Sequence, residues 1–196
     1  MTYSASNVLV DNWTNRRTLS LDVVWVIGFS LLTALLAQVR IPLPFTPVPL
    51  TGQTFGVLLA GAVLGSRRGF ICQTLYLAAG AGGLPVFAGG AFSLAYMLGP
   101  TGGYLWSFPL AAGLLGWLIE AGAGRRIWKL GAVLGFTTGV ILVSGALWLA
   151  VSRGLGVHQA ALLGVYPFLP GEALKVALVM SSLPAILRRY PACESA

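Results

Sequence analysis

Two charged side chains lie three residues apart in the stretch GEALK, residues 171–175. On an α-helix, positions three apart share one face, so Glu172 and Lys175 would project side by side. A carboxylate accepts hydrogen bonds from N–H groups, and an ammonium group donates to a carbonyl oxygen. Together the two groups could bind a planar group that carries both N–H and C=O, such as a cyclic urea or a cyclic amide.

The composition indicates that this pair lies in a membrane protein. Of the 196 residues, 57% are hydrophobic and 9% are charged, whereas soluble domains carry roughly 25% charged residues. The apolar residues form long continuous runs, unlike the short alternating strands of a membrane barrel. These runs fall at 21–39, 53–65, 69–82, 103–121, 130–152 and 171–188. We therefore predict an all-α integral membrane protein with six transmembrane helices.

Two other interpretations of the charged pair stay open at this stage. The pair could be an ion pair that only stabilises helix packing in a structural membrane scaffold. Alternatively, the chain could be an intramembrane enzyme in which Glu172 is a general base and Lys175 stabilises an oxyanion. The sequence has a single histidine, no Gly-x-Ser-Gly motif, and no glycine that precedes a lysine as in an ATP-binding loop. We therefore expect a binding protein and not an enzyme, with no cofactor and no metal.

The basic residues predict how the helices are oriented. Nine of them fall on one side of the membrane: Arg16, Arg17, Arg67, Arg68, Arg125, Arg126, Lys129, Arg188 and Arg189. The connections on the opposite side hold only Arg40 and Arg153. The positive-inside rule then places both termini in the cytoplasm, as an even number of helices requires. We expect a cytoplasmic segment 1–20, a membrane domain 21–189 and a cytoplasmic tail 190–196.

The net charge of +7 follows from this orientation. In a soluble protein such a charge would suggest nucleic-acid binding, but here it reflects topology, so no nucleic acid is expected as a partner. The two cysteines, Cys72 and Cys193, lie far apart in the sequence. Their spacing indicates neither a disulfide framework nor a thiolate metal site.

Two connections on the side of Arg40 are unusually apolar. The first, RIPLPFTPVPLTGQT at 40–54, contains four prolines, which oppose a helix and favour an extended course. The second, GLPVFAGGAFSLAYMLGPTGGY at 83–104, is rich in glycine, proline and aromatic residues. Such loops either pack on the membrane surface or cover a pocket. Since Glu172 begins the last helix on this side, we expect a small, dry pocket that opens outward.

Four stretches of the chain resemble one known family. They are PVPLTGQTFGVLLAGAVLG at 47–65, YLAAGAGGLPVFAGG at 76–90, GPTGGYLWSFPLAA at 99–112 and PFLPGEALKVAL at 167–178. They are similar to the BioY family, the biotin-specific substrate-binding (S) components of energy-coupling-factor (ECF) transporters. The resemblance implies a six-helix S-component bundle in the bacterial inner membrane. It also implies a role in biotin uptake, with biotin bound tightly from outside beneath a lid made by the first loop.

The resemblance also implies which residues contact the ligand. In the family, an acidic residue and a lysine three apart on the last helix hold the ureido ring of biotin, and Glu172 and Lys175 match these positions. Members usually have Asp where this chain has Glu172. From their places in the loops and at helix ends, we expect further contacts from Tyr104, Phe168 and Phe87 as walls and from Thr51 and Gln53 in the lid.

Partner subunits are implied in the same way. S components dock onto a transmembrane coupling subunit, which works with ATPase subunits, through small residues on the first helix, commonly Ala-x-x-x-Ala. This chain keeps the small-residue spacing in two places, with Ser30 and Ala34 and with Thr33 and Ala37. The lipid bilayer is a further expected partner, and a homo-oligomer is compatible with the sequence.

Overall fold

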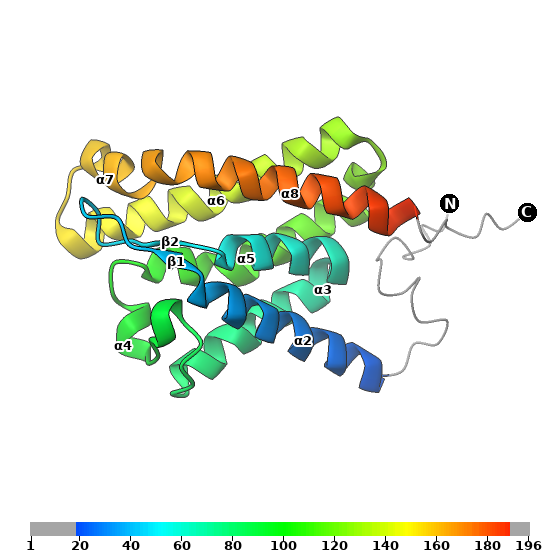
Figure 1. Cartoon of the computed structure of the whole chain (residues 1–196), viewed down its shortest axis with the longest axis horizontal. Helices are drawn as coiled ribbons and strands as arrows, with labels where there is room; N and C mark the ends of the chain where they lie inside the picture. The colour runs from blue at the N-terminus through cyan, green and yellow to red at the C-terminus, as the bar shows by residue number, and fades with distance from the viewer. Residues whose placement is uncertain (1–18, 189–196) are drawn as a thin grey trace, which may run out of the picture.

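The structure, a computed structural model, describes residues 19–188, which form a bundle of long helices (Figure 1). The long helices are α2 (Leu19–Gln38), α3 (Gln53–Ala81), α5 (Gly102–Glu120), α6 (Ile127–Arg153) and α8 (Leu169–Arg188). The short elements are β1 (Arg40–Ile41), β2 (Leu50–Thr51), η1 (Ala88–Gly90), α4 (Leu94–Met97), η2 (Ala123–Arg125), α7 (Val157–Gly164) and η3 (Tyr166–Phe168). The predicted all-α class is confirmed, with one two-residue ribbon added. Residues 1–18 and 190–196 of the predicted terminal segments lie outside the described residues.

The outer surface of the bundle is suited to lipid. Within residues 19–188, five helical segments are long and apolar enough to cross a membrane. Large apolar side chains point away from the bundle, and Leu35, Leu110 and Phe136 are 68%, 65% and 59% exposed. Lipid chains can cover this surface, whereas in water so much exposed apolar area would be unfavourable. The chain is therefore a multi-pass membrane protein.

Helix α3 contains a sharp bend at Gly65. This residue has φ 80° and ψ −175°, a backbone conformation that glycine adopts without the steric penalty of a side chain. A Cβ placed on Gly69 would lie 3.2 Å from the Cα of Gly61, although eight residues of straight helix rise about 12 Å. The second arm of α3 therefore folds back along the first (Figure 1). The predicted runs 53–65 and 69–82 correspond to these two arms, so six predicted runs appear as five long helices.

Close contact between α3 and α5 holds this bend in place. Gly116 of α5 lies against the backbone of Gly65 and Ser66, and a Cβ on Gly61 would lie 2.6 Å from the carbonyl oxygen of Ala112. These glycines let the two backbones approach more closely than residues with side chains would allow. The bend and the α3–α5 packing therefore depend on each other.

The small residues of α2 face the inside of the bundle. Ser30 is 7% exposed, and both Thr33 and Ala37 are fully buried. The Thr33 hydroxyl oxygen accepts a hydrogen bond of 3.1 Å from Nε2 of Gln73 in the second arm of α3. The docking role of Ser30, Ala34, Thr33 and Ala37 stays a prediction. The small-residue spacing serves the approach of α2 to α3 within the chain, and only Ala34 is partly exposed.

Charged groups gather at the end of the bundle where α3 bends. Arg68 Nη2 lies 2.9 Å from Oδ1 of Asp22 in α2. The Glu120 carboxylate, at the end of α5, accepts hydrogen bonds from the backbone N–H and the hydroxyl of Ser66, at 2.7 and 2.8 Å. Helix α2 begins and α8 ends at this same end of the bundle (Figure 1). The arrangement agrees with the predicted clustering of charge, and the assignment of this side to the cytoplasm stays a prediction.

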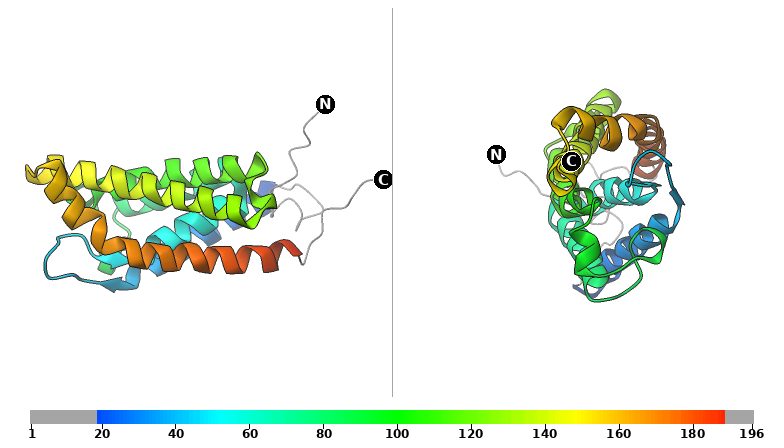
Figure 2. Two further views of the ribbon diagram at one scale, coloured as in Figure 1. Left: turned by 90° about the horizontal axis from the view of Figure 1, so that it is seen from above. Right: turned by 90° about the vertical axis from the view of Figure 1, so that its left-hand side faces the viewer.

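The irregular segments gather at the opposite end. The β1–β2 ribbon, α4 and α7 all lie there, and the view along the bundle shows the ribbon at its rim (Figure 2). The strands pair antiparallel with Arg40 opposite Thr51. We name residues 39–52 the first loop and residues 82–101 the second loop. Both predicted apolar connections therefore meet at the end of the bundle where α8 begins.

A valine at Gly116 tests the close α3–α5 contact. The new side chain would clash with the Gly65 backbone, so we expect Gly116→Val to lower the melting temperature in detergent by several degrees, as overpacking costs about 1–3 kcal/mol. The control is Gly135→Val in α6, where a Cβ meets nothing within 4 Å. Thermal unfolding of both purified variants is the measurement. Equal melting temperatures would show that the bend does not need this contact.

Candidate ligand-binding site

The charged pair of α8 lies inside the bundle and is held by a third residue. Lys175 Nζ lies 2.6 Å from Oε1 of Glu172, and the side chains are 12% and 6% exposed. The hydroxyl of Thr54, at the start of α3, donates to the same carboxylate oxygen at 2.8 Å. Its oxygen accepts from Lys175 Nζ at 2.7 Å. The three side chains thus connect the first turn of α8 to the first turn of α3.

The local sequence explains why Glu172 lies in this position. Pro170 lies next to the start of α8 and cannot donate a backbone hydrogen bond, which suits the first turn of a helix. Glu172 falls in that first turn, where the helix dipole stabilises a negative charge. Lys175 follows three residues later on the same face. The helix start and the ion pair therefore favour the same placement of the carboxylate.

One oxygen of this carboxylate remains without a partner. Glu172 Oε2 is buried and accepts no hydrogen bond from any described group. A buried acceptor left in this condition costs about 1–3 kcal/mol, and more when it is charged. The Glu172 side chain also lines a cavity beneath the two loops. The site therefore presents a charged acceptor that an N–H donor in the cavity would satisfy.

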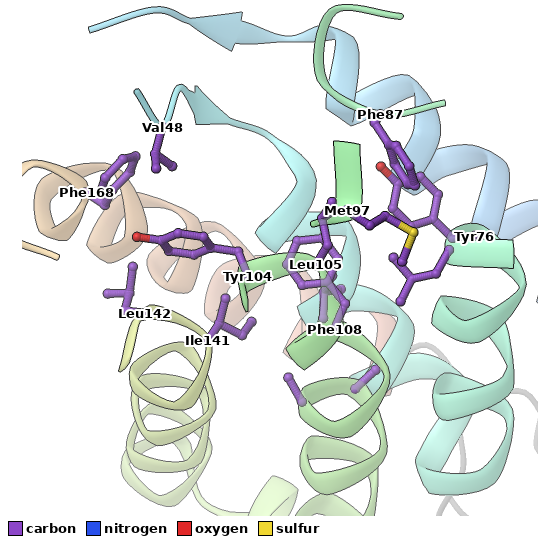
Figure 3. Packing of buried hydrophobic residues seen from close by; sticks show 14 of the residues in the cluster. Val48, Tyr76, Phe87, Met97, Tyr104, Leu105, Phe108, Ile141, Leu142 and Phe168 are labelled. Atoms are coloured by element: carbon purple, nitrogen blue, oxygen red, sulfur yellow. The ribbon is translucent and has the colours of Figure 1, made fainter. Parts of the chain in front are cut away.

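The cavity, which we name the inner cavity, lies between both loops and the ends of α3, α5, α6 and α8. Five of the predicted residues line it, namely Thr51, Gln53, Tyr104, Phe168 and Glu172. The rings of Tyr104 and Phe168 are 6.2 Å apart and inclined by 48°. Figure 3 shows these rings near Val48 of the first loop, with Leu142 of α6 on the other side of Tyr104. Aromatic and aliphatic side chains therefore supply most of its wall.

Tyr104 is a fixed part of that wall. Its hydroxyl donates a 2.6 Å hydrogen bond to the carbonyl oxygen of Gly164 at the end of α7. Its ring lies directly against Gly145 of α6, where any side chain would collide with it. Because its only donor proton is already used, Tyr104 offers the cavity an apolar ring face. It contributes shape to the site, and the donors that a ligand would need come from elsewhere.

The first loop closes the cavity from outside. The Thr46 hydroxyl donates to the carbonyl oxygen of Leu163 in α7 at 2.8 Å. Val48 is buried, and a Cβ on Gly171 would lie 2.9 Å from Leu50. The cavity volume is about 40 Å³, room for roughly three or four waters. A larger ligand can therefore reach Glu172 only if the first loop moves.

A hydrogen-bond chain joins the two loops behind the cavity. Thr51 donates to the Gln53 side-chain oxygen at 2.9 Å, and Gln53 Nε2 donates to the Tyr76 hydroxyl at 2.6 Å. The Tyr76 hydroxyl in turn donates to the carbonyl oxygen of Val86 in the second loop at 3.0 Å. The end of the first loop is therefore coupled to the second loop through the first turn of α3.

Phe87 lies one layer away from the inner cavity. It is fully buried against Gly80, and its ring meets Tyr76 edge-on at 5.6 Å and stacks on Tyr96 at 5.5 Å. Figure 3 shows Phe87 and Tyr76 on the far side of the cluster from Tyr104. Tyr96, which stacks on Phe87, lines the cavity together with Ala88 and Thr101 of the second loop. Phe87 therefore supports the wall and does not form it.

Sequence reasoning missed several lining residues. Thr54, Tyr96, Thr101 and Phe108 line the inner cavity, and none of them was predicted. Thr54 stands next to the predicted Gln53, so its place at a helix start was the available signal. Tyr96 lies in the predicted apolar second connection. By residue type alone, Thr54 cannot be told from the other threonines of the chain, nor Tyr96 from the other tyrosines.

The described residues offer no metal centre in this region or elsewhere. Across residues 19–188, no three His, Cys, Asp or Glu side chains come close enough to hold a metal ion. The arrangement around Glu172 contains a carboxylate, an ammonium group and a hydroxyl, which suits hydrogen bonding to a neutral polar ring. It can bind and orient such a group within apolar walls.

Comparison with known proteins connects this geometry to one family. A family model described as the BioY family matches residues 9–192. The chain is 41% identical over 157 residues to a probable biotin transporter BioY of Pyrococcus horikoshii, covering 80% of this chain and 90% of that protein. It is 36% identical over 158 residues to the biotin transporter BioY of Rhizobium etli, covering 77% and 84% of the two chains.

A solved structure shows the same arrangement. The crystal structure of the S-component for biotin from an ECF-type ABC transporter superposes with a TM-score of 0.79 and 26% sequence identity. The match covers 87% of this chain and 94% of that one. The resemblance noted in the sequence is thereby confirmed, and these relatives are transport proteins, not enzymes. With the family model matching residues 9–192, the chain belongs to the BioY family.

Proposed function

We propose that this chain is the biotin-binding membrane subunit of an uptake system. The relatives named above are biotin transporters, and the similar crystal structure is that of an S-component for biotin. The observation that carries the proposal is the unpartnered oxygen of the buried Glu172 carboxylate at the wall of the inner cavity. Biotin has a cyclic urea with two N–H groups and one carbonyl, and this is the group that such an acceptor complements.

The three polar side chains take different parts in this proposal. Glu172 Oε2 accepts a hydrogen bond from a ureido N–H. Lys175 orients the carboxylate through its 2.6 Å contact, and the Thr54 hydroxyl bonds to both groups. Lys175 uses two of its three N–H donors in these contacts, so one donor remains for the ureido carbonyl. The Tyr104 and Phe168 rings pack against the apolar part of the ligand.

Binding from outside requires the first loop to open. Its tip is held by the single side-chain hydrogen bond from Thr46 to Leu163 and by apolar packing of Val48 and Leu50. These contacts are few beside the backbone packing of α3 against α5. We therefore assign the first loop the role of the lid, which opens to admit biotin and closes over it.

The wider setting of this function rests on the family. We propose the cytoplasmic membrane of the cell as its location, with both chain termini on the cytoplasmic side, as the distribution of basic residues supports. A transmembrane coupling subunit and ATPase subunits would supply the energy, because the chain lacks an ATP-binding loop of its own. Since α2 turns its small residues inward, such a partner would meet the exposed aliphatic face of α2, which includes Val24, Leu31 and Leu35.

Replacing Glu172 tests the site directly. We expect Glu172→Gln to weaken biotin binding by a hundredfold or more, because it removes the charged acceptor and leaves Lys175 without its counter-charge; losses of about 2–5 kcal/mol are typical of such changes. Glu172→Asp keeps the charge and should bind within about tenfold of the natural chain. Isothermal titration calorimetry measures both, and a melting curve confirms that each variant is folded. Unchanged affinity of a folded Glu172→Gln protein would exclude Glu172 from the site.

A second variant tests the lid. We expect Thr46→Val to release bound biotin several times faster, because it removes one hydrogen bond of about 0.5–1.5 kcal/mol between the first loop and α7. The matched control is Thr74→Val, which removes an exposed hydroxyl that bonds only to Phe70 of its own helix. Dissociation is followed by chasing labelled biotin with unlabelled biotin. If both variants release biotin at the natural rate, the Thr46 contact does not hold the lid.

A further inference from the structure

A second, wider cavity lies outside the inner cavity, and we name it the outer groove. Its volume is about 500 Å³, and it runs between the first loop and the second loop, from Arg40 and Pro47 to Gly99. Arg40 is the one charged residue that lines it. The other lining residues are small or apolar apart from Tyr96 and Thr101. The outer groove is therefore an apolar channel with a single positive charge.

The outer groove adjoins the inner cavity. Four residues line both, namely Pro49, Ala88, Tyr96 and Thr101. Arg40 also stands directly opposite Thr51 in the β1–β2 ribbon, and Thr51 lines the inner cavity. Residues paired across two strands project from the same face, so the two side chains are neighbours. A molecule that fills the inner cavity can thus extend past these shared residues towards Arg40.

The Arg40 side chain packs against the second loop. Its guanidinium lies directly against Gly89, whose φ of 72° favours glycine, and a Cβ at that position would collide with it. No carboxylate in residues 19–188 lies within ion-pair distance of Arg40. Of the described acidic residues, Glu172 pairs with Lys175, while Asp22 and Glu120 bond with residues near the α3 bend. The guanidinium therefore has N–H donors to offer to an anion.

The geometry points to Arg40 as a second ligand-binding residue, which recognises a carboxylate at the far end of the ligand from the polar ring. This inference rests on the proposed function, because biotin carries a cyclic urea at one end and a carboxylate at the end of an alkyl chain. Once the first loop has moved to enlarge the inner cavity, the ring lies at Glu172, the chain passes Tyr96 and Thr101, and the carboxylate meets the guanidinium in the outer groove. Arginine suits this role because its planar group can donate two parallel hydrogen bonds to one carboxylate.

The two ends of the site select the orientation of the ligand and distinguish its free acid from neutral derivatives. The deep end of the site presents the free acceptor oxygen of Glu172, which cannot donate a hydrogen bond to a carboxylate, whereas the donors of Arg40 lie at the mouth. A ligand with a free acid is therefore bound ring first, with its acid outward. An ester or amide of the same ligand keeps the ring contacts and loses the ion pair. Arg40 thus distinguishes the free acid from its neutral derivatives.

The test compares two ligands on four proteins. Biotin and biotin methyl ester are titrated into the natural chain, Arg40→Gln, Arg40→Lys and Arg153→Gln, with the proteins purified in the same detergent. Arg153 is an exposed arginine at the end of α6 that lines neither cavity, so it is the matched control. We expect the natural chain and Arg153→Gln to prefer biotin over the ester by on the order of tenfold, the scale of a hydrogen-bonded ion pair near solvent.

We expect Arg40→Gln to lose this preference, because its affinity for biotin falls about tenfold while its affinity for the ester stays the same. Arg40→Lys should keep part of the preference. If Arg40→Gln keeps the full preference for the acid, Arg40 does not bind the carboxylate and the inference is wrong. That outcome would leave the proposed function intact. Failure of the natural chain to bind either ligand would instead contradict the proposed function itself.

Discussion

The contact among Glu172, Lys175 and Thr54 is the constraint around which the rest of the site is arranged. An ionised carboxylate between membrane helices is tolerable only when other groups compensate its charge. The lysine and the hydroxyl do so for one oxygen, at 2.6 and 2.8 Å, and the second oxygen is left facing the inner cavity. The same contact fixes the start of α8 against the start of α3, and the first loop ends where α3 begins. Charge compensation therefore also determines where the loop can close.

The rigid and the movable parts of the molecule are held in place by different kinds of contact. Backbone-to-backbone approach through Gly61 and Gly116 fixes α3 against α5, and the buried hydroxyl of Tyr104 ties α5 to α7. The first loop, in contrast, is joined to α7 by the hydroxyl of Thr46 and otherwise by aliphatic packing. Its opening breaks few hydrogen bonds, so the walls that recognise a ligand can stay in place while access changes.

Much of this site could be predicted from the sequence, and the limits have physical causes. Glu172 and Lys175 stood out because charge is rare in an apolar run and their spacing defines one helix face. Thr54 could not be found in this way, because its partners lie more than a hundred residues away and are set by packing. Phe87 was predicted as a wall, but the space beside Gly80 turns its ring one layer away from the inner cavity. For Thr33 and Ala37, the spacing predicted docking onto a partner subunit, which stays a prediction, and it did not show that both residues are buried within the chain.

The bend at Gly65 bears on how the chain enters a bilayer. The 29 residues of α3 are divided between two arms, so each arm rises about 22 Å on average at 1.5 Å per residue, short of the roughly 30 Å of a hydrocarbon core. Neither arm has the length to be integrated as an independent span, and unsatisfied backbone groups at their ends would face lipid. The two arms must therefore integrate as one hairpin, and α5, which packs against the glycines of that hairpin, completes its burial only after it has been synthesised. The bend at Gly65 therefore links the integration of one arm of α3 to that of the other.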